Sequence, residues 1–229
     1  MGRNAGWLTA AAALANEIGE GPDLVYLPEV PFDIEKFVAD VQRVWDEKHN
    51  VLVAVSEGVR DAEGRFISEL GSNLASQKDA FGHSQMGGLA NTLVNIVKSR
   101  TGLKTRGIEF SLLQRCASHC ASGVDLSEAY DAGEEAVLAA VRGETDKMVA
   151  FKREDTAEYR CRCITVPLSD TANAERTVPL EWMNEERNGM NEQFTAYALP
   201  LIQKAAQMRY ENGLPRFAKL KKIRATAEE

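Results

Sequence analysis

Continuous apolar runs alternate along the chain with longer segments whose apolar residues recur at helical spacing, and this alternation constrains the fold most. Two runs, 24–27 and 51–55, are typical of strands that are buried on both faces of a sheet. Helical patterns lie before, between and after these runs. Such alternation predicts an α/β fold with three layers, in which a mostly parallel sheet carries helices on both faces.

The remaining elements are expected from the same periodicities and from turn and capping residues. Asp33 is expected to cap a helix, and Asp125 with Glu128 forms a capping box before a later one. Glycines at 102 and 143 are expected to end helices. The expected helices cover about 4–15, 33–45, 63–74, 89–99, 125–141 and 192–210, the last interrupted by Pro200, and a third strand covers 105–113.

The first helix begins almost at the first residue and has no strand before it. Because it is rich in Ala and Leu, it is expected to pack closely on a sheet. Two explanations remain open. Either the βα unit has lost its strand, or the helix packs on strands that come later in the chain.

The pattern changes after Gly143, where two short apolar segments, 148–151 and 159–166, are separated by a polar turn. They predict an antiparallel strand pair. We therefore expect an α/β domain over residues 1–145. Residues 146–229 are expected to add the strand pair, a helix and a basic tail that pack back on it.

Charge and cysteine usage exclude several classes of protein. The 229 residues contain 27 Lys and Arg against 34 Asp and Glu, a formal net charge of -7, which disfavours binding along a nucleic-acid backbone. No apolar run is long enough to span a bilayer, so neither nucleic acid nor a membrane is an expected partner. The four cysteines suggest no disulfide framework, and a reduced, cytoplasmic location is expected.

Charged and polar side chains follow the expected strands at the end where parallel sheets bind ligands. Glu29 and Glu57 follow the two apolar runs, and the pair 114–115, Gln-Arg, ends the third expected strand. Residues 2–4, Gly-Arg-Asn, lie at the N-terminus of the first helix, which favours anions. Phosphate donors beside a carboxylate that accepts from hydroxyls indicate a sugar phosphate. The alternative is that both glutamates are solvated loop residues.

Several common site motifs are absent: no P-loop, dinucleotide-binding or nucleophile-elbow pattern occurs. Zinc is a weaker alternative, because Cys-x3-Cys is unusual spacing and strand alternation puts Cys161 and Cys163 on one face. Small buried thiols are the preferred interpretation, and the glycines of loop 82–88 are interpreted as a turn. The residues of the zinc alternative are Cys116, His119, Cys120, Cys161 and Cys163.

Several segments resemble, in the same order, motifs of the phosphofructokinase family. Residues 1–8, MGRNAGWL, resemble its M-G-R-x-x-G-x-L segment, and residues 53–58, VAVSEG, resemble the strand ending in its sugar-binding glutamate. Residues 105–115 are similar to its T-R-x(7)-Q-R segment. The resemblance covers nearly the whole chain and implies the family's three-layer α/β fold. Three more segments, 81–88, 114–119 and 181–186, are similar to the pyrophosphate-dependent and related long-insertion branch.

The resemblance implies roles for particular residues of this sequence. Glu57 would bind sugar hydroxyls, Arg115 would contact the 6-phosphate, and Arg106 would reach a neighbouring subunit's phosphate across a dimer interface. At Leu112 the family often has His or Tyr, and leucine cannot supply that hydrogen bond. The residues implied to bind fructose 6-phosphate are Met1, Gly2, Arg3, Glu57, Arg106 and Arg115.

The resemblance also implies a reaction, 6-phosphofructokinase activity in glycolysis. Pyrophosphate or ATP, with Mg²⁺, would donate a phosphoryl group to the 1-hydroxyl of fructose 6-phosphate, in a homodimer or homotetramer. The family's G-G-D donor loop and T-I-D-x-D segment precede M-G-R, and this chain begins at M-G-R. We therefore expect an N-terminally truncated C-terminal portion, inactive alone, with no catalytic residue and with Mg²⁺ held mainly by the missing half. The alternatives are a non-catalytic sugar-phosphate-binding regulatory subunit and, less favoured, a generic interaction domain.

Overall fold

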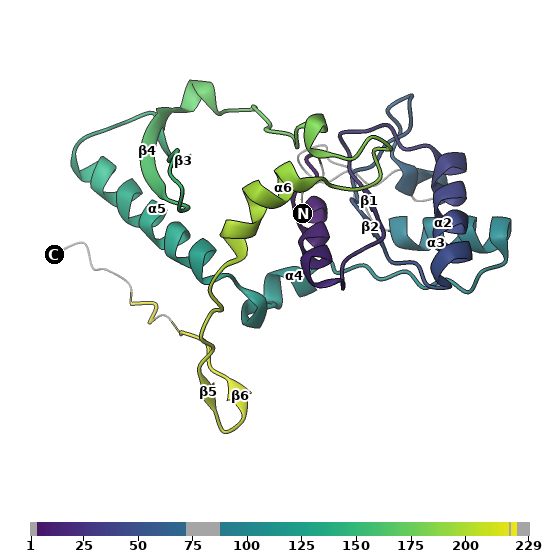
Figure 1. Cartoon of the computed structure of the whole chain (residues 1–229). Coiled ribbons are helices and arrows are strands. Elements are labelled where there is room, and N and C mark those ends of the chain that lie inside the picture. Colours follow the sequence, from purple (N-terminus) through teal and green to yellow (C-terminus); the bar gives the residue numbers. More distant parts are fainter. Residues whose placement is uncertain (1–3, 72–87, 220, 224–229) are drawn as a thin grey trace.

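The computed structural model describes residues 4–71, 88–219 and 221–223, and its centre is a parallel pair of strands. β1 (Leu24–Tyr26) and β2 (Val53–Val55) pair in parallel, with Leu24 opposite Val53. α2 (Ile34–Lys48) connects them and begins at its expected cap, because the Asp33 carboxylate accepts hydrogen bonds from two backbone amides of its first turn. Both expected strands and this helix are confirmed (Figure 1).

Three layers form because successive side chains of β1 point to opposite faces of the sheet. Leu24 and Tyr26 pack into one core with α2 and α3 (Leu89–Thr101). Val25 and Leu27 pack into a second core. That second core also takes in α1 (Trp7–Ala11), the 3-10 helix η1 (Ala12–Ile18) and α6 (Glu192–Ala198). The expected three-layer fold is confirmed, and the Ala-rich first helix does pack on strands later in the chain.

The third strand expected over residues 105–113 is wrong, and the parallel sheet of the described residues has two strands. The segment runs past the start of α3, where the Ala90 amide donates a hydrogen bond to Glu109 Oε1 at 3.2 Å. Ser111 then adopts a positive φ of 43°, and α4 (Leu113–Cys116) follows. The segment therefore contacts the start of α3 and does not form the backbone hydrogen bonds to a neighbouring strand that its alternating pattern predicts.

The helix expected over residues 63–74 is replaced, in its described part, by a turn and the 3-10 helix η2 (Ile67–Gly71). Asp61 Oδ1 accepts hydrogen bonds from the amides of Glu63 and Arg65 at 3.1 and 2.8 Å. An aspartate that bonds the backbone ahead of it favours a turn over a helix. The last three residues of the expected helix lie outside the described residues.

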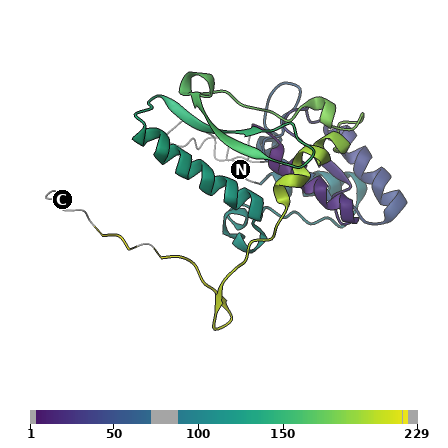
Figure 2. The ribbon, with the colours of Figure 1, turned by 60° about the vertical axis from the view of Figure 1, so that its left-hand side comes forward.

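α5 (Gly123–Val141) packs against a second sheet, the antiparallel pair β3 (Lys147–Arg153) and β4 (Cys161–Pro167) (Figures 1 and 2). The strand pair is confirmed. The capping box at Asp125 is wrong, since the N-cap of α5 is Ser122, whose side chain accepts hydrogen bonds from the first-turn amides. The helix therefore begins two residues earlier than expected.

The C-terminal helix expected over residues 192–210 ends near Pro200, because proline cannot donate to the helix ladder. α6 stops at Ala198, and the chain beyond it becomes a short 3-10 turn and then extended. The small elements not yet named are η3 (Ser118–Cys120), η4 (Leu168–Asp170), η5 (Leu180–Trp182), η6 (Leu199–Ile202), β5 (Tyr210–Glu211) and β6 (Leu214–Pro215).

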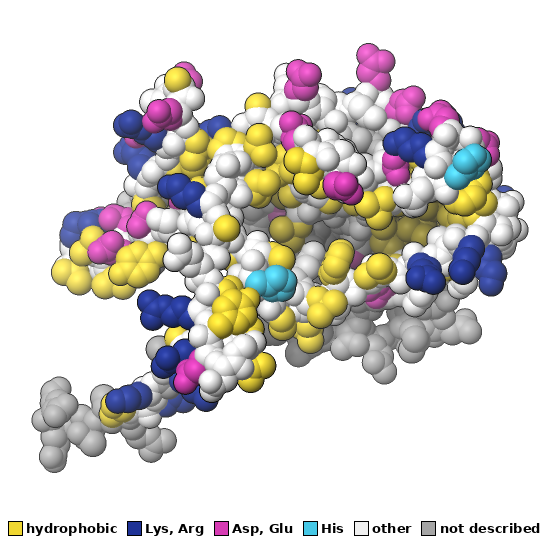
Figure 3. Space-filling view, turned by 60° about the horizontal axis from the view of Figure 1, so that its bottom comes forward, with side chains coloured by type: hydrophobic (Ala, Val, Ile, Leu, Met, Phe, Trp, Pro, Cys, Tyr) yellow, Lys and Arg dark blue, Asp and Glu magenta, His cyan; other side chains and the backbone are white. Residues whose placement is uncertain are grey.

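The surface shows many apolar side chains interspersed with charged ones (Figure 3). Among them are residues of α5, of the segment before α4 and of the β5–β6 hairpin, which projects away from the rest of the chain (Figure 1). The described part of the basic tail is exposed. Among the helices described, none is both long and apolar enough to cross a membrane.

Candidate functional site

Glu29, which follows β1, holds the start of the first helix. Its Oε1 accepts hydrogen bonds from the amides of Gly6 and Val178, both at 2.8 Å. Its other oxygen, Oε2, is buried and finds no hydrogen-bond partner in the described part of the chain. A Cβ added at Gly6 would lie 2.8 Å from that oxygen, so the backbone approaches the carboxylate closely there. The interpretation of Glu29 as a solvated loop residue is therefore wrong.

Glu57 lies two residues beyond β2 and lines a cavity of about 340 Å³. The cavity lies between the first helix and α3 and runs along β2 to the end of that strand, where parallel sheets bind ligands. Gln114 from α4, Thr9 from α1 and Ser68 from η2 also line it. A carboxylate, an amide and two hydroxyls together offer the donors and acceptors that sugar hydroxyls require.

The described lining of this cavity is acidic, since it includes Glu57 and Glu109 but no Lys or Arg. A phosphate group bound here would need cations from outside that lining. Arg115 is exposed on α4, next in the chain to the lining residue Gln114, and Arg106 is exposed on the segment between α3 and α4. The structure thus brings Glu57 and Gln114 together, whereas neither arginine lines the cavity.

The other segments expected to take part in the site are the first three residues, the glycine-rich loop and the residue before α4. Met1, Gly2 and Arg3 lie outside the described residues, as do residues 82–87 of the glycine-rich loop. Leu112 directly precedes α4 with 69% of its surface exposed. The roles implied for Met1, Gly2, Arg3, Glu57, Arg106 and Arg115 therefore stay predictions.

Several residues that line the cavity were not predicted from the sequence. Thr9 and Ser68 carry no motif signal, because each meets the cavity through the packing of helices from different layers. Gln114, by contrast, belongs to the pair 114–115 that the sequence placed at the ligand-binding end of the sheet, and it does line the cavity. Glu109 was assigned to the third expected strand. That assignment gave no indication that its carboxylate accepts a hydrogen bond at the start of α3.

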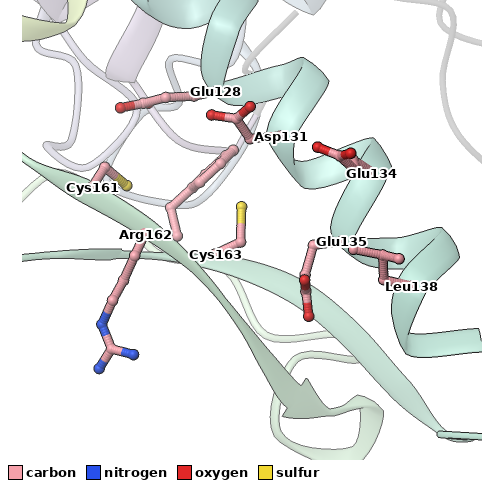
Figure 4. Close-up of a pocket in the computed structure, with 9 residues that line it drawn as sticks. Glu128, Asp131, Glu134, Glu135, Leu138, Cys161, Arg162 and Cys163 are labelled. Carbon is pink, nitrogen blue, oxygen red and sulfur yellow. The ribbon is translucent and has the colours of Figure 1, made fainter. Parts of the chain in front are cut away.

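A second pocket, of about 300 Å³, lies between α5 and the β3–β4 sheet (Figure 4). Four carboxylates of α5 face the thiols of Cys161 and Cys163, while Arg162 points the other way, as strand alternation predicts. Burial raises the pKa of both thiols, and the nearby carboxylates Glu128 and Asp131 raise it further. Both thiols therefore stay protonated at neutral pH, which makes them poor nucleophiles and metal ligands. The four carboxylates are Glu128, Asp131, Glu134 and Glu135.

Buried thiols were expected, and this is wrong for Cys116 and Cys120, which are exposed, while Cys161 and Cys163 are half-buried. Within the residues that the structure describes, no group of three or more His, Cys, Asp or Glu is placed to hold a metal ion. Mg²⁺ prefers carboxylate and phosphate oxygens in octahedral geometry. In phosphate-transferring sites Mg²⁺ is usually held by one or two carboxylates together with the phosphates of the substrate.

Comparison with known proteins shows which family the chain resembles. Residues 1–108 match the family model described as phosphofructokinase. The chain is 41% identical over 226 residues to a pyrophosphate--fructose 6-phosphate 1-phosphotransferase of Halomonas elongata, covering 98% of this chain and 52% of the relative. It is also 32% identical to a sulfofructose kinase of Alkalicoccus urumqiensis, over 84% of this chain and 48% of that relative.

Solved structures give the same result. A crystal structure of a pyrophosphate-dependent phosphofructokinase from Marinobacter aquaeolei matches all of this chain and 53% of its own, with a TM-score of 0.81 and 30% identity. The enzyme of the same description from Nitrosospira multiformis gives 0.82 and 32%, over 97% of this chain and 51% of its own. The chain spans about half the length of the relatives it matches. The resemblance seen in the motifs is confirmed, and the chain belongs to the phosphofructokinase family.

Proposed function

We propose that this chain is the fructose 6-phosphate-binding portion of a pyrophosphate-dependent 6-phosphofructokinase. The complete reaction would move a phosphoryl group from pyrophosphate to the 1-hydroxyl of the sugar and release inorganic phosphate. The observation that carries the proposal is the cavity at the end of β2, where Glu57 and Gln114 offer hydrogen bonds to a sugar. The names of the relatives favour pyrophosphate over ATP as the donor.

Each implied residue has a physical role in this proposal. Glu57 accepts hydrogen bonds from sugar hydroxyls, and Arg115 binds the 6-phosphate through its planar pair of donors. Met1, Gly2 and Arg3 add contacts to the same sugar phosphate. Arg106 serves the site of a neighbouring subunit in a homodimer or homotetramer. These cations compensate for the acidic lining of the cavity.

The proposal also assigns the parts of the chain. Residues 1–145 form the sugar-phosphate-binding domain, and residues 146–229 pack back on it. Phosphoryl transfer depends on positioning and on neutralising charge with metal ions and cations. The chain spans about half the length of its relatives, so we propose that it binds the sugar alone but does not turn it over alone. Mg²⁺ would arrive with the phosphate donor, and a cytoplasmic location suits a glycolytic enzyme.

Calorimetric titration of the purified chain tests the sugar site. Fructose 6-phosphate should bind, and fructose should bind much more weakly. Glu57→Gln should weaken binding by about 1–3 kcal/mol, roughly 5- to 150-fold, because a charge-assisted hydrogen bond is lost. Arg115→Lys should weaken fructose 6-phosphate but leave fructose unchanged, whereas Arg162→Lys, remote from the cavity, is the matched control. Equal binding by all variants would contradict the assigned site.

A coupled assay with pyrophosphate or ATP, magnesium and fructose 6-phosphate tests whether the chain alone catalyses phosphoryl transfer. The chain alone should give background only, and sustained turnover by contaminant-free protein would overturn that expectation. A longer form that binds the sugar but shows no turnover would favour the regulatory alternative. Including sulfofructose, the sugar in the name of one relative, decides which sugar the site prefers.

A further inference from the structure

The start of α1 is held by a segment from the C-terminal part of the chain. The Trp7 indole donates a hydrogen bond to the Arg176 carbonyl at 2.6 Å. The amides of Gly6 and Val178 both donate to Oε1 of Glu29, at 2.8 Å each. These five residues form a latch that joins the two parts of the chain.

Aromatic packing adds to the latch. The centroid of the Trp7 ring lies 6.0 Å from that of Trp182 and 5.5 Å from that of Tyr197. All three side chains are half-buried, and packed aromatic pairs stabilise a fold beyond the area that they bury. Trp182 belongs to segment 181–186, which resembles a family motif. The structure gives this motif a contact with the first motif, residues 1–8.

The latch lies next to the sugar cavity along the chain. Leu8 and Thr9 directly follow Trp7 and line the cavity, and Ala12 lines it one turn later. Successive residues of a helix project about 100° apart. The same helical turn therefore presents Trp7 to the latch and Thr9 to the cavity, so a shift of the latch moves the cavity wall.

The length of the Glu29 side chain determines where α1 begins. Gly6, the N-cap of α1, forms no side-chain cap of its own, and Glu29 binds its amide instead. A Cβ at Gly6 would lie 2.8 Å from both Glu29 Oε2 and Leu27 Cδ2, so the backbone is already at its closest approach. Moving the carboxylate would therefore move the start of the helix.

We propose that Glu29 and Trp7 are positioning residues for the sugar-phosphate site. This inference rests on the proposed function. Neither residue is among the described residues that line the cavity, so each acts through the first turn of α1, which carries Thr9. Residues 1–3, the proposed phosphate contacts, precede the latched residues in the chain. A misplacement of about 1 Å in a functional group can cost about 100-fold in activity.

Substitutions at Glu29 separate position from charge, with fructose 6-phosphate binding measured by calorimetric titration. Glu29→Asp keeps the charge but is one methylene too short to reach both amides, and it should weaken binding by about tenfold or more. Glu29→Gln keeps the length and one acceptor oxygen, so it should weaken binding less. A larger loss in Glu29→Gln than in Glu29→Asp would overturn the proposal.

Matched variants separate positioning from lost stability. Trp7→Phe keeps a ring but removes the donor to Arg176, and should weaken sugar binding roughly two- to tenfold. Trp45 is also half-buried, but it packs on His49 and lies outside the described cavity lining, so Trp45→Phe should leave the affinity unchanged. Asp40→Asn should lower the melting temperature without weakening sugar binding.

Near-ultraviolet circular dichroism follows the latch without sugar. Glu29→Asp should change the tryptophan signal, because Trp7 and Trp182 lie close together, whereas Asp40→Asn should preserve it. The proposal is wrong if Glu29→Asp changes this signal but binds fructose 6-phosphate as well as Asp40→Asn does. It is also wrong if the affinity falls while the signal is unchanged. Absence of binding to the unchanged chain would instead contradict the proposed function, and the positioning roles with it.

Discussion

Asp40 of α2 joins three separate segments through its carboxylate. Its Oδ2 accepts hydrogen bonds from the Tyr26 hydroxyl of β1 at 2.8 Å, from Lys36 Nζ at 2.7 Å and from Asn188 Nδ2 at 2.9 Å. Burial alone would raise the pKa of Asp40, but these three donors outweigh it and hold the pKa below its ordinary value. The ionised form is therefore part of the folded structure.

Asp40→Asn should lower the free energy of unfolding at pH 7 by about 1.5–3 kcal/mol, the worth of hydrogen bonds to a charged group. Because the pKa is lower in the folded state, the contribution is complete above the unfolded pKa of about 3.9. It is lost as the pH falls through the folded value. Urea unfolding of the unchanged chain and of the Asp40→Asn variant should therefore show that the difference between their free energies of unfolding becomes smaller below about pH 4.

Asp46→Asn is the matched control for this experiment. Asp46 lies on the same helix, is exposed and accepts one hydrogen bond from Gln42 at 2.7 Å. Its change should stay within about 0.5 kcal/mol. If Asp40→Asn lowered the free energy of unfolding by the same amount at neutral and at acid pH, this would contradict the assignment of an ionised Asp40 carboxylate.

At the scale of elements, the residue that caps α5 also contacts a segment far away in the sequence. Ser122 Oγ accepts hydrogen bonds from the Val124 and Asp125 amides at 3.2 and 3.3 Å. The same hydroxyl donates toward the carbonyls of Leu201 and Gln203, at 2.7 and 3.0 Å. One side chain therefore caps the helix and ties it to the segment after α6.

Ser122→Ala should destabilise the chain by about 1–2 kcal/mol, because the cap and the tie are both lost. Asp125→Ala should change the stability by less than about 0.5 kcal/mol, since Asp125 supplies its amide and not its side chain to the cap. Urea unfolding of the two variants measures both effects. If Asp125→Ala destabilised the chain more than Ser122→Ala, the capping box at Asp125 would be the start of the helix after all.

At the scale of the whole molecule, α5 leaves an apolar stripe exposed. Leu126, Tyr130, Val137 and Val141 recur at helical spacing on one face and are each more than half exposed. Ala139, by contrast, is 6% exposed. Contiguous apolar surface of this kind promotes self-association.

Replacing Val137 and Val141 together by lysine should reduce self-association of the chain, measured by sedimentation velocity, with little change in melting temperature. Both side chains are exposed, so no packing is lost. Ala139→Lys is the contrasting variant, because it forces a charge into a buried position and should lower the melting temperature. Unchanged association in the double variant would mean that another surface holds the copies together.

Elements whose signals are local could be predicted from neighbouring residues alone. The apolar runs of β1 and β2, the Asp33 cap and the β3–β4 pair depend on neighbouring residues, and all appear as predicted. The motif order also identified the family, since each motif is a short contiguous segment.

Other features of the fold and of the site could not be predicted in this way, because they join residues far apart in the chain. Glu29 holds the start of α1 because the amides of Gly6 and Val178 both donate to its Oε1. Residues 105–113 alternate like a strand, yet a strand needs a partner edge, and the start of α3 offered contacts instead. The free energies of strand pairing and of burial depend on all the surfaces that come together in the fold. Local sequence patterns can therefore suggest such contacts, but they do not determine which of them form.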